Sequence, residues 1–84
     1  MQPTYDSIIV LFFGRAADIM KTRRLDFALS GAGLTLYDLR DQVFSGHLPL
    51  ANSLRMSVNQ SVVSADQALH AGDEVAFFSV FSGG

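Results

Sequence analysis

The sequence predicts an α+β fold, a mixed sheet of about five strands with one main helix across one face. Apolar, β-branched and aromatic runs lie near both ends of the chain, as expected for buried strands. Between them, several stretches alternate polar and apolar residues, and one stretch repeats apolar residues at helical spacing. With 84 residues, the chain is expected to form a single domain over residues 1–84.

The first strand is expected over residues 7–14, where the continuous apolar run is typical of a strand covered on both faces. Alternation divides its side chains into two sets, Ile8, Val10 and Phe12 against Ile9, Leu11 and Phe13. A short helical turn is expected over residues 15–22, with Ala16, Ile19 and Met20 on one side. Residues 23–29 alternate and predict a strand antiparallel to the first, with Leu25, Phe27 and Leu29 inward.

The main helix is expected over residues 36–44, after a loop at residues 30–33. Thr35 is a typical N-cap residue, with Asp38 three positions later as in a weak capping box. Gly46 suits a left-handed C-cap, and Pro49 is interpreted as confirming the break.

The second half of the chain predicts three more strands. Residues 54–59 alternate, Asn59-Gln60 marks a turn, and residues 61–64 form a short strand. One turn of helix is expected over residues 65–70, with Leu69 inward, followed by a turn at residues 71–73. The last strand is expected over residues 74–80 and is again apolar on both faces.

The two doubly apolar strands, at opposite ends of the chain, are the natural centre of the sheet. They can pair in parallel because the helix-containing middle supplies the long connection that parallel pairing requires. One sheet with one helix across it is the β-grasp arrangement. The helix covers one face only, so the face that includes Phe13 and Phe78 is expected to lie open.

Composition narrows the class of function. The net charge is −2, and the basic residues form no run beyond Arg23-Arg24, which argues against nucleic acid as a partner. The chain has no cysteine, so no disulfide and no thiol carrier is available. Residues 1–6 lack the basic start of a signal peptide and are assigned no role. The longest apolar run is far too short to span a bilayer, and a cytoplasmic protein is expected.

The sequence resembles the small subunit of molybdopterin synthase, within the ubiquitin-like sulfur carriers. The matching stretches are Val10-Leu-Phe-Phe-Gly14, Val58-Asn-Gln60, Gly72-Asp-Glu-Val-Ala-Phe-Phe78 and the terminal Ser82-Gly-Gly84. The match runs from about Ile8 to Gly84. The family's tail usually carries prolines before the glycines, whereas this chain has Ser79-Val-Phe81 there.

The resemblance implies a carrier that holds no catalytic side chain and binds no cofactor or metal. A ubiquitin-activating-type adenylyltransferase would use ATP to adenylate the carboxylate of Gly84, and a sulfur donor enzyme would convert it to a thiocarboxylate. The tail would then enter the large catalytic subunit of molybdopterin synthase and give its sulfur to cyclic pyranopterin monophosphate in molybdenum cofactor biosynthesis. A heterotetramer of two small and two large subunits is implied in the same way.

The tail suits this chemistry on physical grounds. No side chain from Val75 to Gly84 is charged, so the terminal carboxylate would be the single charge there. Gly84 leaves its carboxyl carbon unhindered, and Gly83 permits backbone angles that help a flexible chain enter a narrow channel. Phe81, Ser82, Gly83 and Gly84 would together reach roughly 13 Å when extended. Gly83-Gly84 alone would favour an idle end; the match over the whole chain favours function.

Phe13, Val62 and Phe78 correspond by position to the family's hydrophobic contact patch. We expect them to bind the large subunit and the activating enzyme, with ordinary core packing as the alternative for each. The remaining polar candidates fit a structural role better than a chemical one. His47 and His70 have no second ligand at metal spacing, Asp38 and Asp41 suit a solvated helix face, and Asp73-Glu74 suits a turn. Ser30-Gly-Ala-Gly33 lacks the continuation of a phosphate-binding loop.

Alternative functions stay open. The same thiocarboxylate would serve thiazole synthesis or tRNA thiolation, and a ubiquitin-like modifier would be joined to target lysines through Gly84. A plain interaction domain is a more distant alternative. An autonomous enzyme is the weakest, because the sequence contains no catalytic constellation.

Overall fold

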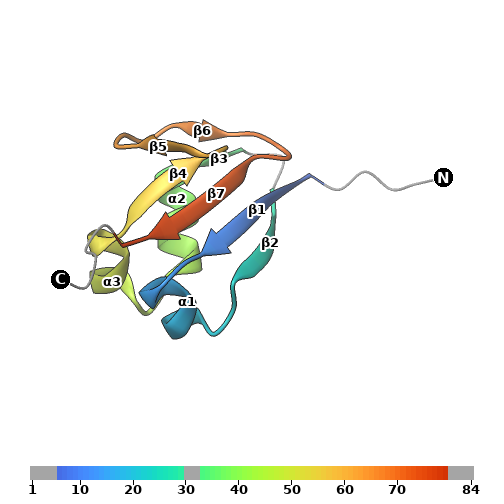
Figure 1. Ribbon diagram of the computed structural model, residues 1–84. Coiled ribbons are helices and arrows are strands. Elements are labelled where there is room, and N and C mark those ends of the chain that lie inside the picture. The colour runs from blue at the N-terminus through green and yellow to red at the C-terminus, as the bar shows by residue number, and fades with distance from the viewer. Residues whose placement is uncertain (1–5, 30–32, 80–84) are drawn as a thin grey trace.

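The computed structural model describes residues 6–29 and 33–79 and confirms the α+β, β-grasp fold (Figure 1). Its main sheet has the strand order β2-β1-β7-β4-β5, and a second, two-stranded pairing joins β3 and β6. In chain order the elements are β1 (Ser7–Phe12), α1 (Arg15–Met20), β2 (Arg24–Ala28), β3 (Leu34–Thr35), α2 (Leu36–Val43), α3 (Leu48–Ser53), β4 (Arg55–Val58), β5 (Ser61–Val63), β6 (Ala68–Leu69) and β7 (Glu74–Phe78).

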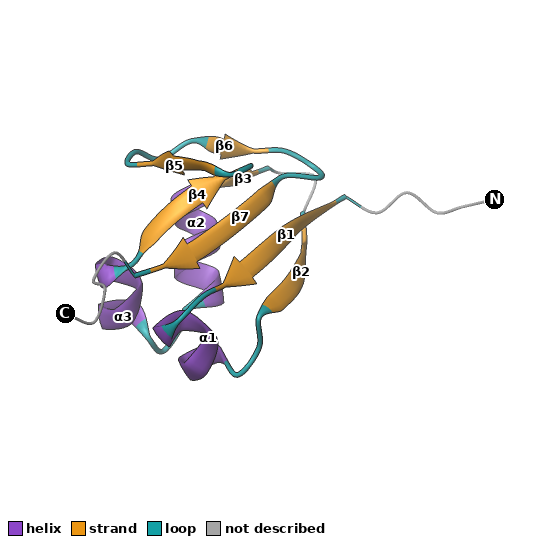
Figure 2. Ribbon diagram, viewed as in Figure 1, coloured by secondary structure: helices purple, strands orange, loops and turns teal. Residues whose placement is uncertain are grey.

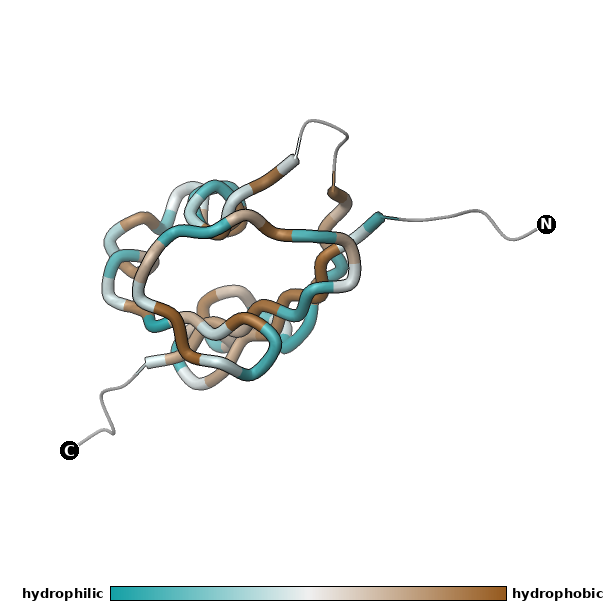
Figure 3. Tube along the Cα trace, turned by 90° about the horizontal axis from the view of Figure 1, so that it is seen from above, coloured by the Kyte–Doolittle hydropathy of each residue, from teal (hydrophilic) through white to brown (hydrophobic). Residues whose placement is uncertain are grey.

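The two strands predicted to be central, β1 and β7, lie side by side and parallel. Their register sets Val10 beside Val75 and Phe12 beside Phe77, and all four side chains are buried. β2 pairs antiparallel with β1, as the predicted hairpin requires, and β4 pairs antiparallel with β7. The start of β1 and the end of β7 therefore lie at opposite ends of the molecule (Figures 1 and 3).

The core lies between the sheet and the three helices, which cover the same face of the sheet (Figure 2). An aromatic cluster stands at its centre. Phe44, which follows α2, meets Phe77 edge to face with ring centroids 5.0 Å apart, and it meets Phe12 in the same manner at 5.8 Å. Such pairs add to the burial of the rings themselves. The helical spacing in the sequence thus identified the residues that close the core.

The main helix is α2, and its first turn is capped from three places. The Oγ1 atom of Thr35 accepts from the N–H of Asp38 at 3.2 Å, which confirms the predicted N-cap. The carboxylate of Asp66 accepts from the N–H of Tyr37 at 2.8 Å, and the carbonyl of Gln67 accepts from Leu36. The helix ends with Phe44 as its C-cap, and Gly46 has the expected positive φ of 88° two residues later.

Two expectations about elements are wrong. Residues 65–70 do not form a helical turn; Ala68–Leu69 instead pairs as β6 with β3, because the preceding Asp66 and Gln67 accept hydrogen bonds from the first turn of α2. The break that Pro49 was interpreted as confirming is present between α2 and α3, but the expectation that no helix follows it is wrong, because Pro49 lies in the first turn of α3. Proline is tolerated there, since the N–H that it lacks has no partner within the helix.

Two apolar side chains of the predicted elements remain partly exposed. Ile19 on α1 is 40% exposed and Leu25 on β2 is 38% exposed. Leu25 pairs with buried Val10 and so lies on the core face, but β2 is an edge strand and little covers its outer side. The short helix α1 begins after Gly14, whose φ of 58° and ψ of −128° let the chain turn sharply out of β1. Within the described ranges, no helix is long and apolar enough to cross a bilayer.

Candidate docking face and carrier tail

None of the helices in the described part of the chain covers one face of the main sheet, and we call this face the open face (Figure 2). Its middle row crosses all five strands in register. From β2 to β5 the row is Arg24, Leu11, Ala76, Ser57 and Val62. The small side chains of Ala76 and Ser57 are in the centre of the row, and the larger apolar side chains of Leu11 and Val62 lie on either side of them. A surface of this kind is typical of a site that binds another protein.

The structure brings the three predicted contact residues onto this face. Val62 is 57% exposed and Phe13 is 52% exposed, whereas Phe78 is half-buried. The N–H of Phe13 donates to the carbonyl of Phe77 at 3.1 Å, which continues the parallel register by one residue and sets Phe13 beside Phe78. The core alternative is thus excluded for Phe13 and Val62 by their exposure. Their role in binding stays a prediction.

Phe13 and Phe78 lie at the end of the sheet where β7 finishes, so the tail begins next to the open face. The predicted tail residues Phe81, Ser82, Gly83 and Gly84 lie outside the described residues, as does Val80 at the end of the predicted last strand. The structure therefore shows that the tail leaves the sheet at the end of β7, next to the open face. The chemistry expected of Gly84 stays a prediction.

Charged side chains lie at the margins of the open face. Asp26, Ile9 and Glu74 form the next row toward the start of β7, and Arg55 pairs with Phe78 at the opposite end. Arg24 and Asp26 form an exposed ion pair, with 3.1 Å between Nε and Oδ1. Exposed ion pairs of this type contribute little to the stability of the fold. The apolar centre thus has an acidic margin at one end and a cation at the end from which the tail begins.

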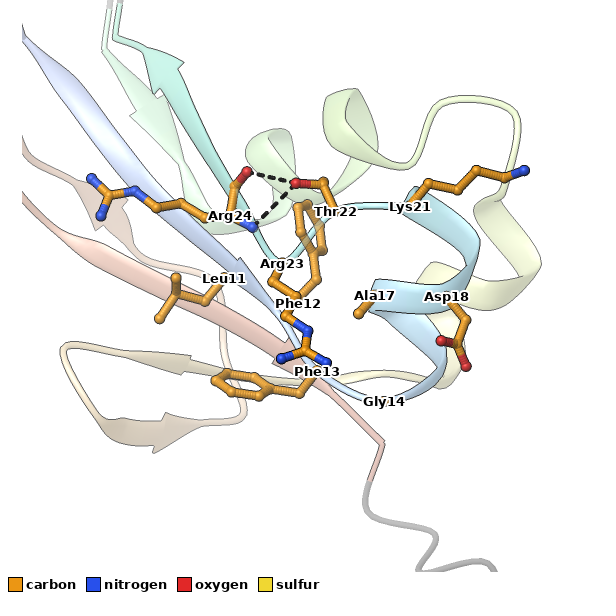
Figure 4. Close-up of a pocket in the computed structure, with 10 residues that line it drawn as sticks. All are labelled: Leu11, Phe12, Phe13, Gly14, Ala17, Asp18, Lys21, Thr22, Arg23 and Arg24. Carbon is orange, nitrogen blue, oxygen red and sulfur yellow. Dashed lines mark hydrogen bonds between the residues drawn. The ribbon is translucent and has the colours of Figure 1, made fainter.

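A pocket of about 710 Å³ adjoins the open face at the corner between α1, β1 and β2 (Figure 4). We call it the corner pocket. Leu11 and Phe13 belong to both surfaces. The sequence analysis gave no sign of this pocket, because its residues meet only when α1 folds against the end of the β1–β2 hairpin. Its lining residues are Leu11, Phe12, Phe13, Gly14, Ala17, Asp18, Lys21, Thr22, Arg23 and Arg24.

At the far end of the sheet, Asp73 joins two loops. Its carboxylate accepts from the side-chain amide of Asn59 at 3.0 Å and from the N–H of His70 at 2.7 Å. Asn59 in turn accepts from the N–H of Glu74 at 2.9 Å. Burial alone would raise the pKa of Asp73, but the hydrogen bonds from Asn59 and His70 and the nearby imidazole lower it below its usual value. This network supports the structural role expected of Asp73.

The other polar candidates are dispersed. His47 is exposed at the start of α3, and Nδ1 of the exposed His70 lies 3.8 Å from Asp73. Asp38 and Asp41 are exposed on α2. Within residues 6–29 and 33–79, no group of three or more histidine, aspartate or glutamate side chains is placed to hold a metal ion.

Sequence reasoning assigned Phe13 and Phe78 to the open face but missed the residues that shape it on β4. Arg55 and Ser57 face outward because Met56 and Val58 face the core, and the alternation of residues 54–59 contained that signal. The cations near the start of the tail, Arg15, Lys21, Arg23 and Arg55, also went unnoticed, because they come from separate segments of the chain.

Comparisons with known proteins agree with this geometry. The ThiS family model matches residues 10–84. SAMP1 from Haloferax volcanii is 24% identical, with a TM-score of 0.74 over 93% of this chain and 99% of that chain. A candidate molybdopterin converting factor, subunit 1, from Pyrococcus furiosus is 21% identical, with a TM-score of 0.74 over 87% and 95%. Urm1 from Trypanosoma brucei is 22% identical, with a TM-score of 0.64 over 99% and 100%.

No curated protein matches the sequence. The structural matches share the fold of this chain, and the family model covers most of its length. The chain belongs to the ThiS family, within the ubiquitin-like sulfur carriers.

Proposed function

We propose that this chain is the sulfur-carrying small subunit of a molybdopterin synthase, with Gly84 as its carboxyl end. The observation that carries the proposal is the position of an exposed apolar face beside the root of a Gly-Gly tail in a ThiS family protein. A partner that binds the open face would hold the tail in one direction and receive its end. The structural match to a candidate molybdopterin converting factor subunit 1 supports this pathway.

The activation step makes the carboxylate of Gly84 reactive. One carboxylate oxygen attacks the α-phosphate of ATP, pyrophosphate leaves, and an acyl-adenylate forms in the active site of the adenylyltransferase. A sulfur nucleophile from the donor enzyme then attacks the carbonyl carbon, and AMP leaves with the oxygen it had gained. With a persulfide as that nucleophile, the product is an acyl disulfide; a thiol then attacks the donor's sulfur, forms a disulfide with it and leaves the tail as a thiocarboxylate. The described residues of this chain would bind the partner enzymes and orient the tail, while the chemistry takes place in the active sites of those enzymes.

The transfer step returns the tail to its starting state. In the large subunit, sulfur of the thiocarboxylate passes to cyclic pyranopterin monophosphate, and water restores the carboxylate of Gly84. The five residues from Val80 to Gly84 would extend roughly 17 Å, which is long enough to enter a neighbouring active site. The chain itself is proposed to be non-catalytic.

A chain that lacks Gly84 tests this function. In cells that depend on this chain for the cofactor, we expect the loss of Gly84 to abolish molybdopterin formation, measured as the oxidised pterin product. The circular dichroism spectrum of the shortened chain should match that of the wild type, because the fold is unchanged. Gln42→Glu, an exposed change on α2, is the control and should give normal levels. Normal molybdopterin without Gly84 would reject the proposal.

The likeness to SAMP1, small archaeal modifier protein 1 of Haloferax volcanii, favours a second candidate function. In that function the activated carboxylate of Gly84 is attacked by a lysine amine, and an amide joins the chain to its target. Target peptides that carry a Gly-Gly remnant on lysine, and that disappear without Gly84, would support the modifier function.

A further inference from the structure

The end of the sheet from which the tail begins gathers most of the positive charge of an acidic chain. Four cations from three segments lie around this end and make no ion pair within the described part of the chain; they are Arg15, Lys21, Arg23 and Arg55. Carboxylates mark the opposite end, where β1 and β7 begin, namely Asp6, Asp73 and Glu74. The molecule is therefore polarised along the direction of its central strands although its net charge is only −2.

The corner pocket lies at this positive end and combines an apolar floor with cationic walls. The side chain of Phe12 is buried beneath it and Ala17 is half-buried. In Figure 4 the guanidinium of Arg23 lies near Phe13, and Lys21 extends from the end of α1. The one acidic lining residue, Asp18, projects from the helix away from β2 (Figure 4). Arg24 is already paired with Asp26.

We propose that the corner pocket is a second docking point, beside the open face, for an acidic segment of the activating adenylyltransferase. A glutamate or aspartate side chain would lay its apolar part against Phe13 and Ala17 and its carboxylate against Arg23, with Lys21 adding positive charge at the rim of the pocket. The activating enzyme is the natural occupant, because both the carrier function and the modifier function begin with adenylation. The inference rests on that activation step of the proposed function. Charge complementarity of this kind sets encounter rate and orientation.

The test uses the full chain and the adenylyltransferase of its own host, with ATP–pyrophosphate exchange that depends on added carrier as the readout. Lys21→Gln and Arg23→Gln each lower the net charge by one, and Gln42→Glu on α2 does the same outside the pocket lining. We expect each pocket variant to raise the KM for the carrier about threefold, the double variant to raise it about tenfold, and kcat to stay unchanged. Added salt should raise the KM of the wild type more than that of the double variant.

The outcomes distinguish a failure of the proposed docking point from a failure of the proposed activation step. If the wild type supports exchange but the pocket variants keep its KM, or if Gln42→Glu changes KM equally, the corner pocket is not a docking point. If the wild type and the chain lacking Gly84 both fail to support exchange, the activation step is wrong and this inference falls with it. Amide spectra of the variants that match the wild type outside the substituted corner ensure that a raised KM reports docking rather than unfolding.

Discussion

The N–H of Phe13 donates a hydrogen bond to the carbonyl of Phe77 at 3.1 Å, one residue past the end of β1. This bond holds an exposed aromatic side chain beside the last residue of β7, although Phe13 itself lies in no strand. The candidate docking face and the end of β7 are therefore fixed to each other by the ladder between the two central strands. A partner that binds Phe13 would receive the tail from a defined direction.

Phe13→Ala should weaken binding to a partner while leaving the fold intact. An aromatic anchor that becomes buried in an interface contributes over ~2 kcal/mol, or at least about thirtyfold in Kd. The measurement is isothermal titration with the activating enzyme. Leu48→Ala is the matched control, because Leu48 is also exposed, at 47%, but lies on α3 rather than on the open face. Equal affinities for Phe13→Ala and wild type would remove Phe13 from the docking face.

Phe44→Ala should remove much of the stability of the domain. Phe44 is fully buried and contacts the rings of Phe12 and Phe77. Truncation of a buried phenylalanine costs ~3–5 kcal/mol, against a total of about 5–15 kcal/mol for a domain. Urea unfolding followed by circular dichroism measures the difference. A loss below about 1 kcal/mol would contradict the aromatic core described above.

Asp66→Ala should destabilise the start of α2 although Asp66 is 29 positions away from its hydrogen-bond partner, Tyr37. The loss of one capping hydrogen bond costs about 1 kcal/mol. Thr35→Ala removes the second side-chain cap and should cost a similar amount. Hydrogen exchange at the amides of Tyr37 and Asp38 distinguishes the two, because each variant should speed exchange chiefly at its own partner. Unchanged exchange at Tyr37 in Asp66→Ala would rule out the long-range cap.

The network around Asp73 should make stability depend on pH in the acid range. The pKa of Asp73 is lower in the folded chain than its usual value, so its contribution is present above the unfolded pKa. That contribution is lost as pH falls from about 4 through the lower, folded pKa. Unfolding free energies between about pH 6 and pH 2 should therefore fall less steeply for Asp73→Asn than for the wild type.

Asn59→Ala provides the companion variant, because it removes the side-chain donor to Asp73 and keeps the carboxylate. The acid slope of this variant should lie between those of the wild type and Asp73→Asn. The same slope in all three proteins would show that Asp73 does not report the pH dependence.

The central part of the fold could be predicted because its causes are local. The continuous apolar runs of β1 and β7 identify the two central strands, and the helical spacing of Leu36 and Leu39 identifies α2. The elements that were missed have causes that are not local. β6 depends on Asp66 and Gln67, which are held by the first turn of α2, far away in sequence. The helix α3 was hidden by a proline that a first turn tolerates.

The candidate docking face, like the fold, could be predicted from the sequence only in part. Alternation along β1 and β7 assigned Phe13 and Phe78 to the face away from the helix, and the structure confirms that placement. The corner pocket was not predictable, because Arg23 and Ala17 meet only through the sharp turn at Gly14 and the packing of α1. The polarity of charge was missed for the same reason: the cations lie apart in the sequence, and only the fold brings them to one end of the molecule.

The mass of the carboxyl-terminal peptide, taken from the protein isolated from its native host, tests the central claim most directly. During active sulfur loading, we predict a fraction of chains that end at Gly84 with one carboxylate oxygen replaced by sulfur. A peptide that carries only the carboxylate under those conditions, or a chain that continues past Gly84, would contradict the account.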